Sequence, residues 1–316
     1  MFVFYTVILN LFFLPGCFQT EKIPPICTTE YPIRFVNCSG MDNLENFRDI
    51  FYQEVNRTSS NSAIVGVRIA NSFFPFIAQE FFKGLKFGRL IIENTALISL
   101  SDTDTAFEGL EKYLKVLIIK NSVLFSDLNW YQLRNLRELK FIILENIELE
   151  FVDSDMSSIA AVGLVQLSMA NNRISHISDN SFAPFVHLQD LSLHHNNISE
   201  LKRSMFPNPG NKLSRLNLGH NKISSLPSDF FTNMPSLTFI ILSHNELLTL
   251  DQAVFATIWK SLTTVLLSEN PLRCDCRLKW LLKQKFPMFT YGTCAGPPKL
   301  RGKDLAKLED LDLWCF

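Results

Sequence analysis

Three histidines recur at a fixed spacing and are the residues best suited to do chemistry. His195, His220 and His244 are separated by 25 and 24 residues, and His194 precedes the first of them. A stacked row of imidazoles would suit a transition metal or a pH switch. A metal site normally adds cysteine or carboxylate ligands, and the sequence places no such cluster beside the row. We therefore expect half-exposed polar positions, with no metal and no cofactor.

Six cysteines gather near the two ends of the chain and are the second candidate for chemistry. An even number of terminal cysteines in a secreted chain predicts disulfides. A zinc site built from the last four is the alternative, although a Cys-x-Cys spacing is awkward for metal ligands. Four cysteines allow three connectivities, so their spacing does not select one. The six are Cys27, Cys38, Cys274, Cys276, Cys294 and Cys315.

An uncharged apolar stretch, residues 2–14, directly follows the first methionine and is broken by Leu14-Pro15-Gly16-Cys17. It is shorter than the roughly 20 residues that a membrane-spanning helix needs. The stretch predicts a secretory signal peptide over residues 1–17, although no Lys or Arg precedes it. We expect a secreted, extracellular protein without a membrane span.

Charge and motif content argue against two classes of protein. The formal net charge is -1 and no long run of one sign occurs, so nucleic acid is not an expected partner. No Ser/His/Asp signature, glycine-rich phosphate loop or dense carboxylate pair is present. We expect no enzymatic activity; a hydrolase or metalloenzyme that uses the histidine row is the catalytic alternative.

A repeat of about 24 residues organises the chain that carries these residues. The string LVQLSMANNRISHI begins at Leu164, and its pattern restarts at Leu188, Leu213 and Leu237. Weaker copies on both sides bring the number of expected strand segments to nine over residues 64–272. Because side chains alternate along a strand, positions 1, 4 and 6 of each copy point inward, and positions 3 and 5 point outward.

Two further positions of the repeat predict interior structure. An asparagine at position 9 can satisfy backbone groups where the chain leaves the strand. A phenylalanine eighteen residues after each start can fill the space between successive turns. Thr95, Ser122 and Ile147 replace the asparagine in early repeats, so we expect a looser region there. The asparagines are Asn172, Asn196, Asn221, Asn245 and Asn270, and the phenylalanines are Phe182, Phe206, Phe231 and Phe255.

Residues 64–316 resemble extracellular leucine-rich-repeat proteins with a cysteine-rich C-terminal cap. The cap motif runs Asn270-Pro271-Leu272-Arg273-Cys274-Asp275-Cys276 and continues into an apolar helix pattern. The resemblance implies an α/β solenoid with a parallel concave sheet of about nine strands and disulfide-stapled caps. It also implies that Cys274 bonds to Cys294 and Cys276 to Cys315.

The expected organisation is a signal peptide (1–17), an N-terminal cap (18–63), leucine-rich repeats (64–269) and a cysteine-rich C-terminal cap (270–316). The N-terminal cap departs from the family, which often has four cysteines there, whereas only Cys27 and Cys38 are present. Ile33, Phe35 and Val36 predict a hairpin strand in this cap.

Outward strand positions form the surface on which we expect a partner to bind, on the order of 40 Å long for nine rungs. An apolar block on this surface should face solvent. Such patches usually mark interaction sites, although β-branched residues also simply favour strands. The candidate partner-binding residues are Ile91, Val116, Ile118, Phe141, Ile143, His195, Arg215, Asn217, His220, Phe239, Ile241 and His244.

The family resemblance implies a secreted protein that binds an extracellular protein ligand or receptor through its concave face, in recognition or adhesion. The alternative is a non-catalytic stabilising subunit of a secreted enzyme such as a luciferase-like monooxygenase. The chain is similar in organisation to the leucine-rich-repeat subunit of shrimp luciferase. Acceptor sequons at Asn37, Asn56 and Asn197 predict a glycoprotein.

Overall fold

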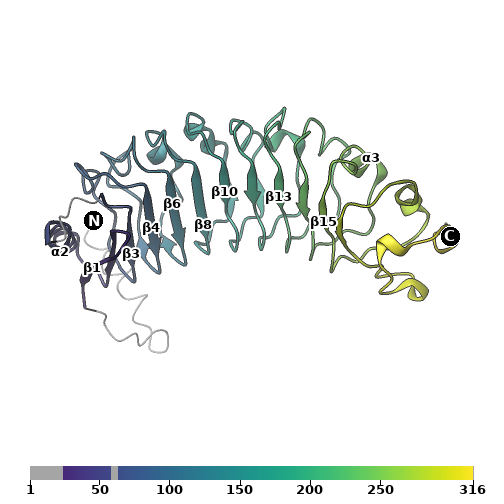
Figure 1. Ribbon diagram of the computed structural model, residues 1–316, viewed down its shortest axis with the longest axis horizontal. Helices are drawn as coiled ribbons and strands as arrows, with labels where there is room; N and C mark the ends of the chain where they lie inside the picture. Colours follow the sequence, from purple (N-terminus) through teal and green to yellow (C-terminus); the bar gives the residue numbers. More distant parts are fainter. Residues whose placement is uncertain (1–23, 58–62, 316) are drawn as a thin grey trace.

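The computed structural model describes residues 24–57 and 63–315, in which the rungs of a solenoid follow one another in chain order (Figure 1). The predicted signal peptide, residues 1–17, lies outside the described residues. One twelve-stranded sheet runs through the molecule, with every neighbouring pair parallel except β1 and β2. Its strands are β1 (Ile26–Glu30), β2 (Phe35–Ser39), β3 (Gly66–Ala70), β4 (Arg89–Glu93), β6 (Val116–Lys120), β8 (Phe141–Glu145), β10 (Gln166–Ser168), β12 (Asp190–Ser192), β13 (Arg215–Asn217), β14 (Phe239–Ile241), β15 (Thr264–Leu266) and β16 (Phe289–Tyr291).

The nine strands from β3 to β15 in this sheet confirm the predicted repeat strands, and β1, β2 and β16 extend the sheet at its ends. Short elements complete each turn. Two small sheets pair β5 (Ala96–Leu97) with β7 (Val123–Leu124), and β9 (Phe151–Val152) with β11 (His176–Ile177). The helices are α2 (Leu44–Arg57), α3 (Gln252–Phe255) and the 3-10 helices η1 (Trp130–Leu133), η2 (Ser154–Ile159), η3 (Arg203–Met205), η4 (Cys276–Lys283), η5 (Pro298–Leu300), η6 (Leu305–Lys307) and η7 (Asp310–Asp312).

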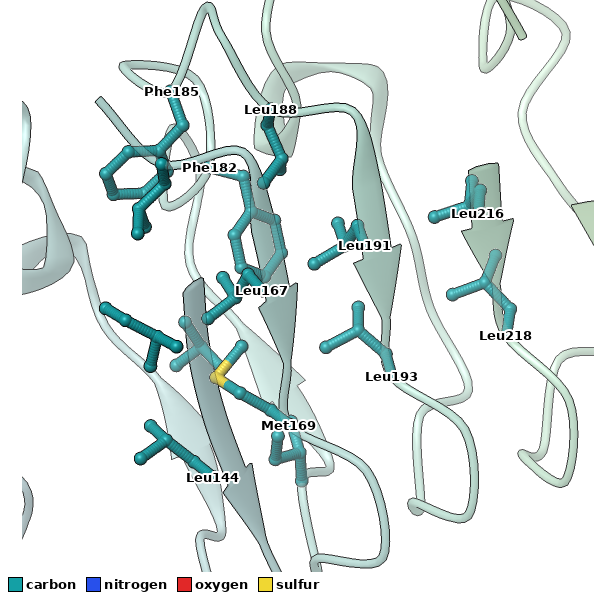
Figure 2. Close-up of a cluster of buried hydrophobic side chains, with 14 of the residues drawn as sticks. Leu144, Leu167, Met169, Phe182, Phe185, Leu188, Leu191, Leu193, Leu216 and Leu218 are labelled. Carbon is teal, nitrogen blue, oxygen red and sulfur yellow. The ribbon is translucent and has the colours of Figure 1, made fainter. Parts of the chain in front are cut away.

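The core lies between the sheet and the returning segments of the repeats. Leu213, Leu216 and Leu218 are at most 1% exposed, while Arg215 is exposed, as the strand alternation predicts. Figure 2 shows the equivalent leucines of adjacent rungs packed in register beside Phe182. The rings of the predicted phenylalanines follow one another through the interior. The ring centres of Phe182 and Phe206, for example, lie 5.9 Å apart. Each repeat therefore buries its apolar side chains against its neighbours.

A ladder of buried asparagines closes the turns that follow the strands. In a typical rung, Asn221 Oδ1 accepts a hydrogen bond from the Ile198 N–H at 3.1 Å, and Asn221 Nδ2 donates to the carbonyls of Leu193 and Leu218 at 3.0 Å. These bonds satisfy backbone groups that no sheet partner reaches. The same pattern recurs, as predicted, at Asn172, Asn196, Asn245 and Asn270.

Hydroxyl groups take over this position in the early repeats. Ser72 Oγ accepts the Met41 N–H at 3.1 Å, and Ser122 Oγ accepts the Thr95 N–H at 3.2 Å. Each hydroxyl of Ser72, Thr95 and Ser122 also donates to a carbonyl two residues earlier. These three side chains are buried and the adjacent strands are five residues long rather than three, so hydroxyls replace the asparagine at Thr95 and Ser122, while a looser region stays a prediction.

Both ends of the solenoid are covered and cross-linked. Cys27 is bonded to Cys38, as the cysteines near the N-terminal end predict. Cys274 is bonded to Cys294 and Cys276 to Cys315, the pairing that the family resemblance implies. At the N-terminal end, Phe47 and Phe51 of α2 are fully buried. At the C-terminal end, Leu278, Trp280 and Leu281 of η4 are buried, and Trp280 Nε1 donates to the Leu250 carbonyl at 2.9 Å.

Candidate functional site

The face of the twelve-stranded sheet that points away from the core is the candidate site, and we refer to it as the concave face. The sheet register aligns its outward residues into columns that cross all the rungs. One column reads Asn37, Arg68, Ile91, Ile118, Ile143, Ser168, Ser192, Asn217, Ile241, Leu266 and Tyr291. The adjacent column reads Phe35, Gly66, Arg89, Val116, Phe141, Gln166, Asp190, Arg215, Phe239, Thr264 and Phe289.

Five of the predicted binding residues form one apolar surface, the N-terminal block: Ile91, Val116, Ile118, Phe141 and Ile143. Ile118 of β6 pairs with Ile91 of β4 on one side and with Ile143 of β8 on the other. Val116 and Phe141 are also paired. All five side chains are partly exposed, so the sequence placed them correctly on the outer face of three adjacent rungs.

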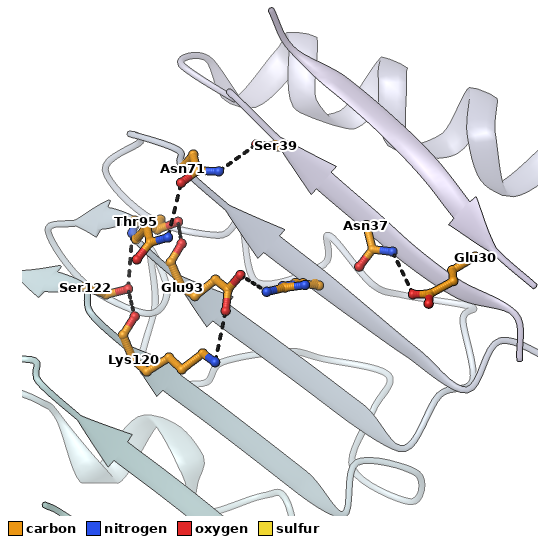
Figure 3. A network of polar contacts seen from close by, with 10 residues as sticks. Glu30, Asn37, Ser39, Asn71, Glu93, Thr95, Lys120 and Ser122 are labelled. Atoms are coloured by element: carbon orange, nitrogen blue, oxygen red, sulfur yellow. Dashed lines mark hydrogen bonds and ion pairs between the residues drawn. The ribbon is translucent and has the colours of Figure 1, made fainter. Parts of the chain in front are cut away.

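A buried carboxylate lies at the edge of the N-terminal block. The side chain of Glu93 is 9% exposed, and it forms ion pairs with Arg68 on β3 and with Lys120 on β6, the latter at 3.2 Å. Figure 3 shows the contact between the Glu93 carboxylate and Lys120 as a dashed line. A buried carboxylate needs compensating charge, and two cations from the adjacent strands supply it. This cluster links three rungs, and its charges are largely neutralised by one another.

The middle of the concave face is polar and hollowed. A hollow of about 240 Å³ extends from Ile143 to Ile241 across rungs β8 to β14. On its wall Arg215 lies 3.4 Å from Asp190 and places its guanidinium 4.3 Å from the centre of the Phe239 ring. Burial raises the pKa of Asp190, and the charge of Arg215 partly opposes this. The side chain of Asn217 is engaged locally, because its Oδ1 accepts the Gly219 N–H.

Exposed aromatic residues close the concave face at its C-terminal end. Phe239 and Ile241 are partly exposed, and β16 adds Phe289 and Tyr291, which are 48% and 57% exposed. The sequence pattern missed the last two residues because β16 lies in the C-terminal cap, outside the 24-residue repeat. The concave face therefore has two apolar ends separated by a charged middle.

The predicted histidine row exists, and the backbone explains why it is there. His195, His220 and His244 have φ angles of 54°, 53° and 55°, and the same position is asparagine in five earlier rungs with φ between 48° and 54°. Asparagine and histidine are both enriched in this left-handed region. The rings of His195 and His220 stack at 3.8 Å, and those of His220 and His244 at 3.9 Å. The row is thus an exposed edge of the concave face.

The pKa is lowered at His220 of the row and at His194, which precedes the row. Burial, followed by the charges of His195, His244 and His194, lowers the pKa of His220. Burial and His195 also lower the pKa of His194, and Glu145 opposes this shift. Among the described residues, no group of three or more His, Cys, Asp or Glu side chains is arranged to hold a metal ion.

Of the predicted glycosylation sites, Asn37 is half-buried on β2 at the end of the concave face, Asn56 is exposed at the end of α2, and Asn197 is half-buried in a turn. A larger hollow of about 760 Å³ lies at the C-terminal cap, beside the Cys276–Cys315 disulfide. No helix in the described part of the chain is long and apolar enough to cross a membrane.

Comparison with known proteins gives a family-model match over part of the chain and a likeness of fold. Residues 186–247 and 211–272 match the family model described as leucine rich repeat. No curated protein matches the chain. A chain in the solved structure of the Toll–Spatzle complex of Drosophila is similar, with a TM-score of 0.58 and 20% sequence identity. The match covers 89% of this chain and 45% of that one, so this chain spans less than half the length of its structural relative, and the likeness is one of fold.

Proposed function

Because the chain is a leucine-rich-repeat protein, we propose that it is a secreted, non-catalytic protein that binds an extracellular protein ligand or receptor through its concave face. The observation that carries the proposal is the N-terminal block. Five partly exposed apolar side chains on three adjacent rungs form a continuous apolar surface. Continuous apolar surface of this kind on a soluble domain marks an interaction site.

The shape and stability of the concave face also favour a protein partner. Nine rungs at a spacing of about 4.8 Å extend over roughly 40 Å, which matches the dimensions of a protein interface. The asparagine ladder and the disulfide-bonded caps restrain this face, so little conformational entropy is lost on binding. The structure to which the fold is similar is that of a complex between two proteins, Toll and Spatzle.

Three disulfides favour an oxidising compartment. We propose accordingly that residues 1–17 direct secretion and that Asn37, Asn56 and Asn197 are glycosylated. Residues 18–63 and 270–316 act as caps of the 64–269 repeats in this proposal.

The proposal is tested by affinity purification of the tagged, secreted chain from its own tissue, followed by mass spectrometry. Ile118→Thr/Ile143→Thr is purified in parallel, because threonine keeps the strand preference and removes the apolar surface. Ile98→Thr, at an exposed isoleucine outside the concave face, is the matched control. A receptor or matrix protein that is recovered with the wild type and the control but lost with the double variant supports the proposal. A partner recovered equally with all three would place its binding elsewhere on the molecule. A soluble enzyme in fixed stoichiometry would make the chain an accessory subunit.

A further inference from the structure

Three cations beside the N-terminal block have no carboxylate partner. Arg89, Lys115 and Lys140 form no ion pair within the described residues, in contrast to Arg68 and Lys120, which share Glu93. Arg89 and Lys115 are exposed and Lys140 is partly exposed. A cation that is neither buried nor paired is free to meet a partner's negative charge.

The three cations lie on the same three rungs as the apolar block. Arg89 of β4 pairs in register with Val116, Lys115 directly precedes Val116, and Lys140 directly precedes Phe141. The Lys140 N–H donates to the Lys115 carbonyl, and the Lys115 N–H donates to the Gly88 carbonyl, so consecutive rungs carry them. They therefore border the N-terminal block along the edge at which the strands begin, at a rung spacing of about 4.8 Å.

This concentration of charge is local. At the position of Lys115 and Lys140, the later rungs carry Val165, Gln189, Ser214, Thr238, Thr263 and Met288, none of which is charged. On the block's other side, the two positive charges of Arg68 and Lys120 are balanced by the two negative charges of Glu93 and Glu145. The three unpaired cations therefore leave rungs β3 to β8 of the concave face with a formal charge of +3, although the whole chain carries -1.

We propose that the segment of the partner that binds the N-terminal block is an acidic and apolar polypeptide. Its Leu, Ile or aromatic side chains cover Ile118 and Ile143, and its Asp or Glu carboxylates meet Arg89, Lys115 and Lys140. The apolar contacts supply most of the affinity, and the cations supply orientation and a faster encounter. This inference rests on the proposed function, because it specifies the chemistry of the partner for the same face.

A library of random twelve-residue peptides displayed on phage tests the inference without knowledge of the natural partner. The full secreted chain is immobilised and enriched peptides are sequenced. We expect enrichment of Asp and Glu together with Leu, Ile and Phe. A synthetic copy of the most enriched peptide should bind Arg89→Gln/Lys115→Gln/Lys140→Gln about tenfold more weakly than the wild type, because each exposed ion pair contributes modestly. This loss should shrink at high salt.

Matched variants separate this inference from the proposed function. Lys222→Gln/Lys260→Gln/Lys285→Gln removes three lysines that likewise form no ion pair in the described residues, and it should bind the peptide like the wild type. Ile118→Thr/Ile143→Thr should lose the peptide. Enriched peptides without acidic residues, or a triple variant of Arg89, Lys115 and Lys140 that binds within twofold of the wild type, would overturn the inference. The proposed function would survive that result if the isoleucine variant still lost binding.

Heparin is the second probe, since a sulfated polysaccharide would also seek unpaired cations. Two results together would contradict the proposal and assign the cations to a polysaccharide. The chain would be retained on heparin only when Arg89, Lys115 and Lys140 are present, and the enriched peptides would lack acidic residues. Failure to enrich any peptide that depends on the isoleucines or on the cations would count against both the inference and the proposed function. Thermal melts of all variants establish that each is folded.

Discussion

Replacement of Asn221 by alanine tests the idea that buried side-chain amides hold the turns of the solenoid. The substitution removes the acceptor of the Ile198 N–H and the donor to the carbonyls of Leu193 and Leu218. The two carbonyls keep a second amide partner each, from Asn196 and Asn245 at 2.9 Å. Loss of the Asn221 hydrogen bond therefore costs about 0.5 to 1 kcal/mol at each carbonyl. The buried N–H of Ile198 has no second partner among the described residues, and leaving it unpaired costs about 1 to 3 kcal/mol.

The sum is about 3 kcal/mol of unfolding free energy, measured by urea denaturation followed by circular dichroism. Lys222→Ala, at the exposed neighbouring residue, is the control and should change the unfolding free energy by less than about 0.5 kcal/mol. A loss below about 1 kcal/mol for Asn221→Ala would mean that water or a backbone shift satisfies the turn. Hydrogen bonding by the buried amide would then not explain why asparagine recurs at position 9 of the repeat.

Three further predictions concern pH, cross-linking and packing. Because the pKa of His220 is lowered in the folded chain, the unfolded state binds more protons, so the unfolding free energy should fall as pH drops below about 6.5. His220→Asn, which keeps a residue suited to φ of 53°, should flatten that dependence in denaturation series from pH 7.5 to 5, and an unchanged slope would contradict the pKa shift. Cys276→Ser/Cys315→Ser should cost about 2 to 4 kcal/mol of unfolding free energy in a thermal melt; no change would mean that the cap folds without this bond. Phe206→Ala, at a fully buried ring, should cost about 3 to 5 kcal/mol, whereas Phe151→Ala, at a ring that is 41% exposed, should cost far less; similar losses would contradict the interior role of Phe206.

The repeat made most of the fold predictable, because one spacing rule places every inward leucine on the core side. The N-terminal helix α2 was missed, although its signal was present: Leu44, Phe47, Phe51 and Val55 have helical spacing, and Asn43 Oδ1 accepts the Glu45 N–H as an N-cap. Residues 44–57 precede the repeat, so the 24-residue pattern that predicts the strands carries no information on this helix.

Strand β16 had a weaker signal. Its inward residue is Thr290, which is only half-buried, so Phe289–Tyr291 lacks the leucine that marks the other rungs. It joins the sheet because Val265 and its neighbours on β15 offer free backbone partners. Tertiary context decided this element, as it does for many short strands.

The candidate site was only partly predictable, for a physical reason. The outward position of Ile118 follows from the alternation of the strand, but no rule of folding determines which outward residues bind a partner. The unpaired state of Lys115 and Lys140 also depends on where carboxylates lie in space. Conversely, the spacing of His220 in the sequence suggested a metal site or a pH switch, whereas its positive backbone φ explains why a histidine stands at this position.

The central claim is that the concave face is where the partner binds, and site-specific photo-crosslinking tests it most directly. A photoreactive phenylalanine analogue is placed at Ile118 on the concave face or at Val186, an exposed residue outside that face. Both secreted chains are irradiated in extract of the source tissue. The account predicts one covalent adduct with a distinct protein partner at position 118 and none at 186. An adduct at 186 alone, or equal adducts at both positions, would contradict it.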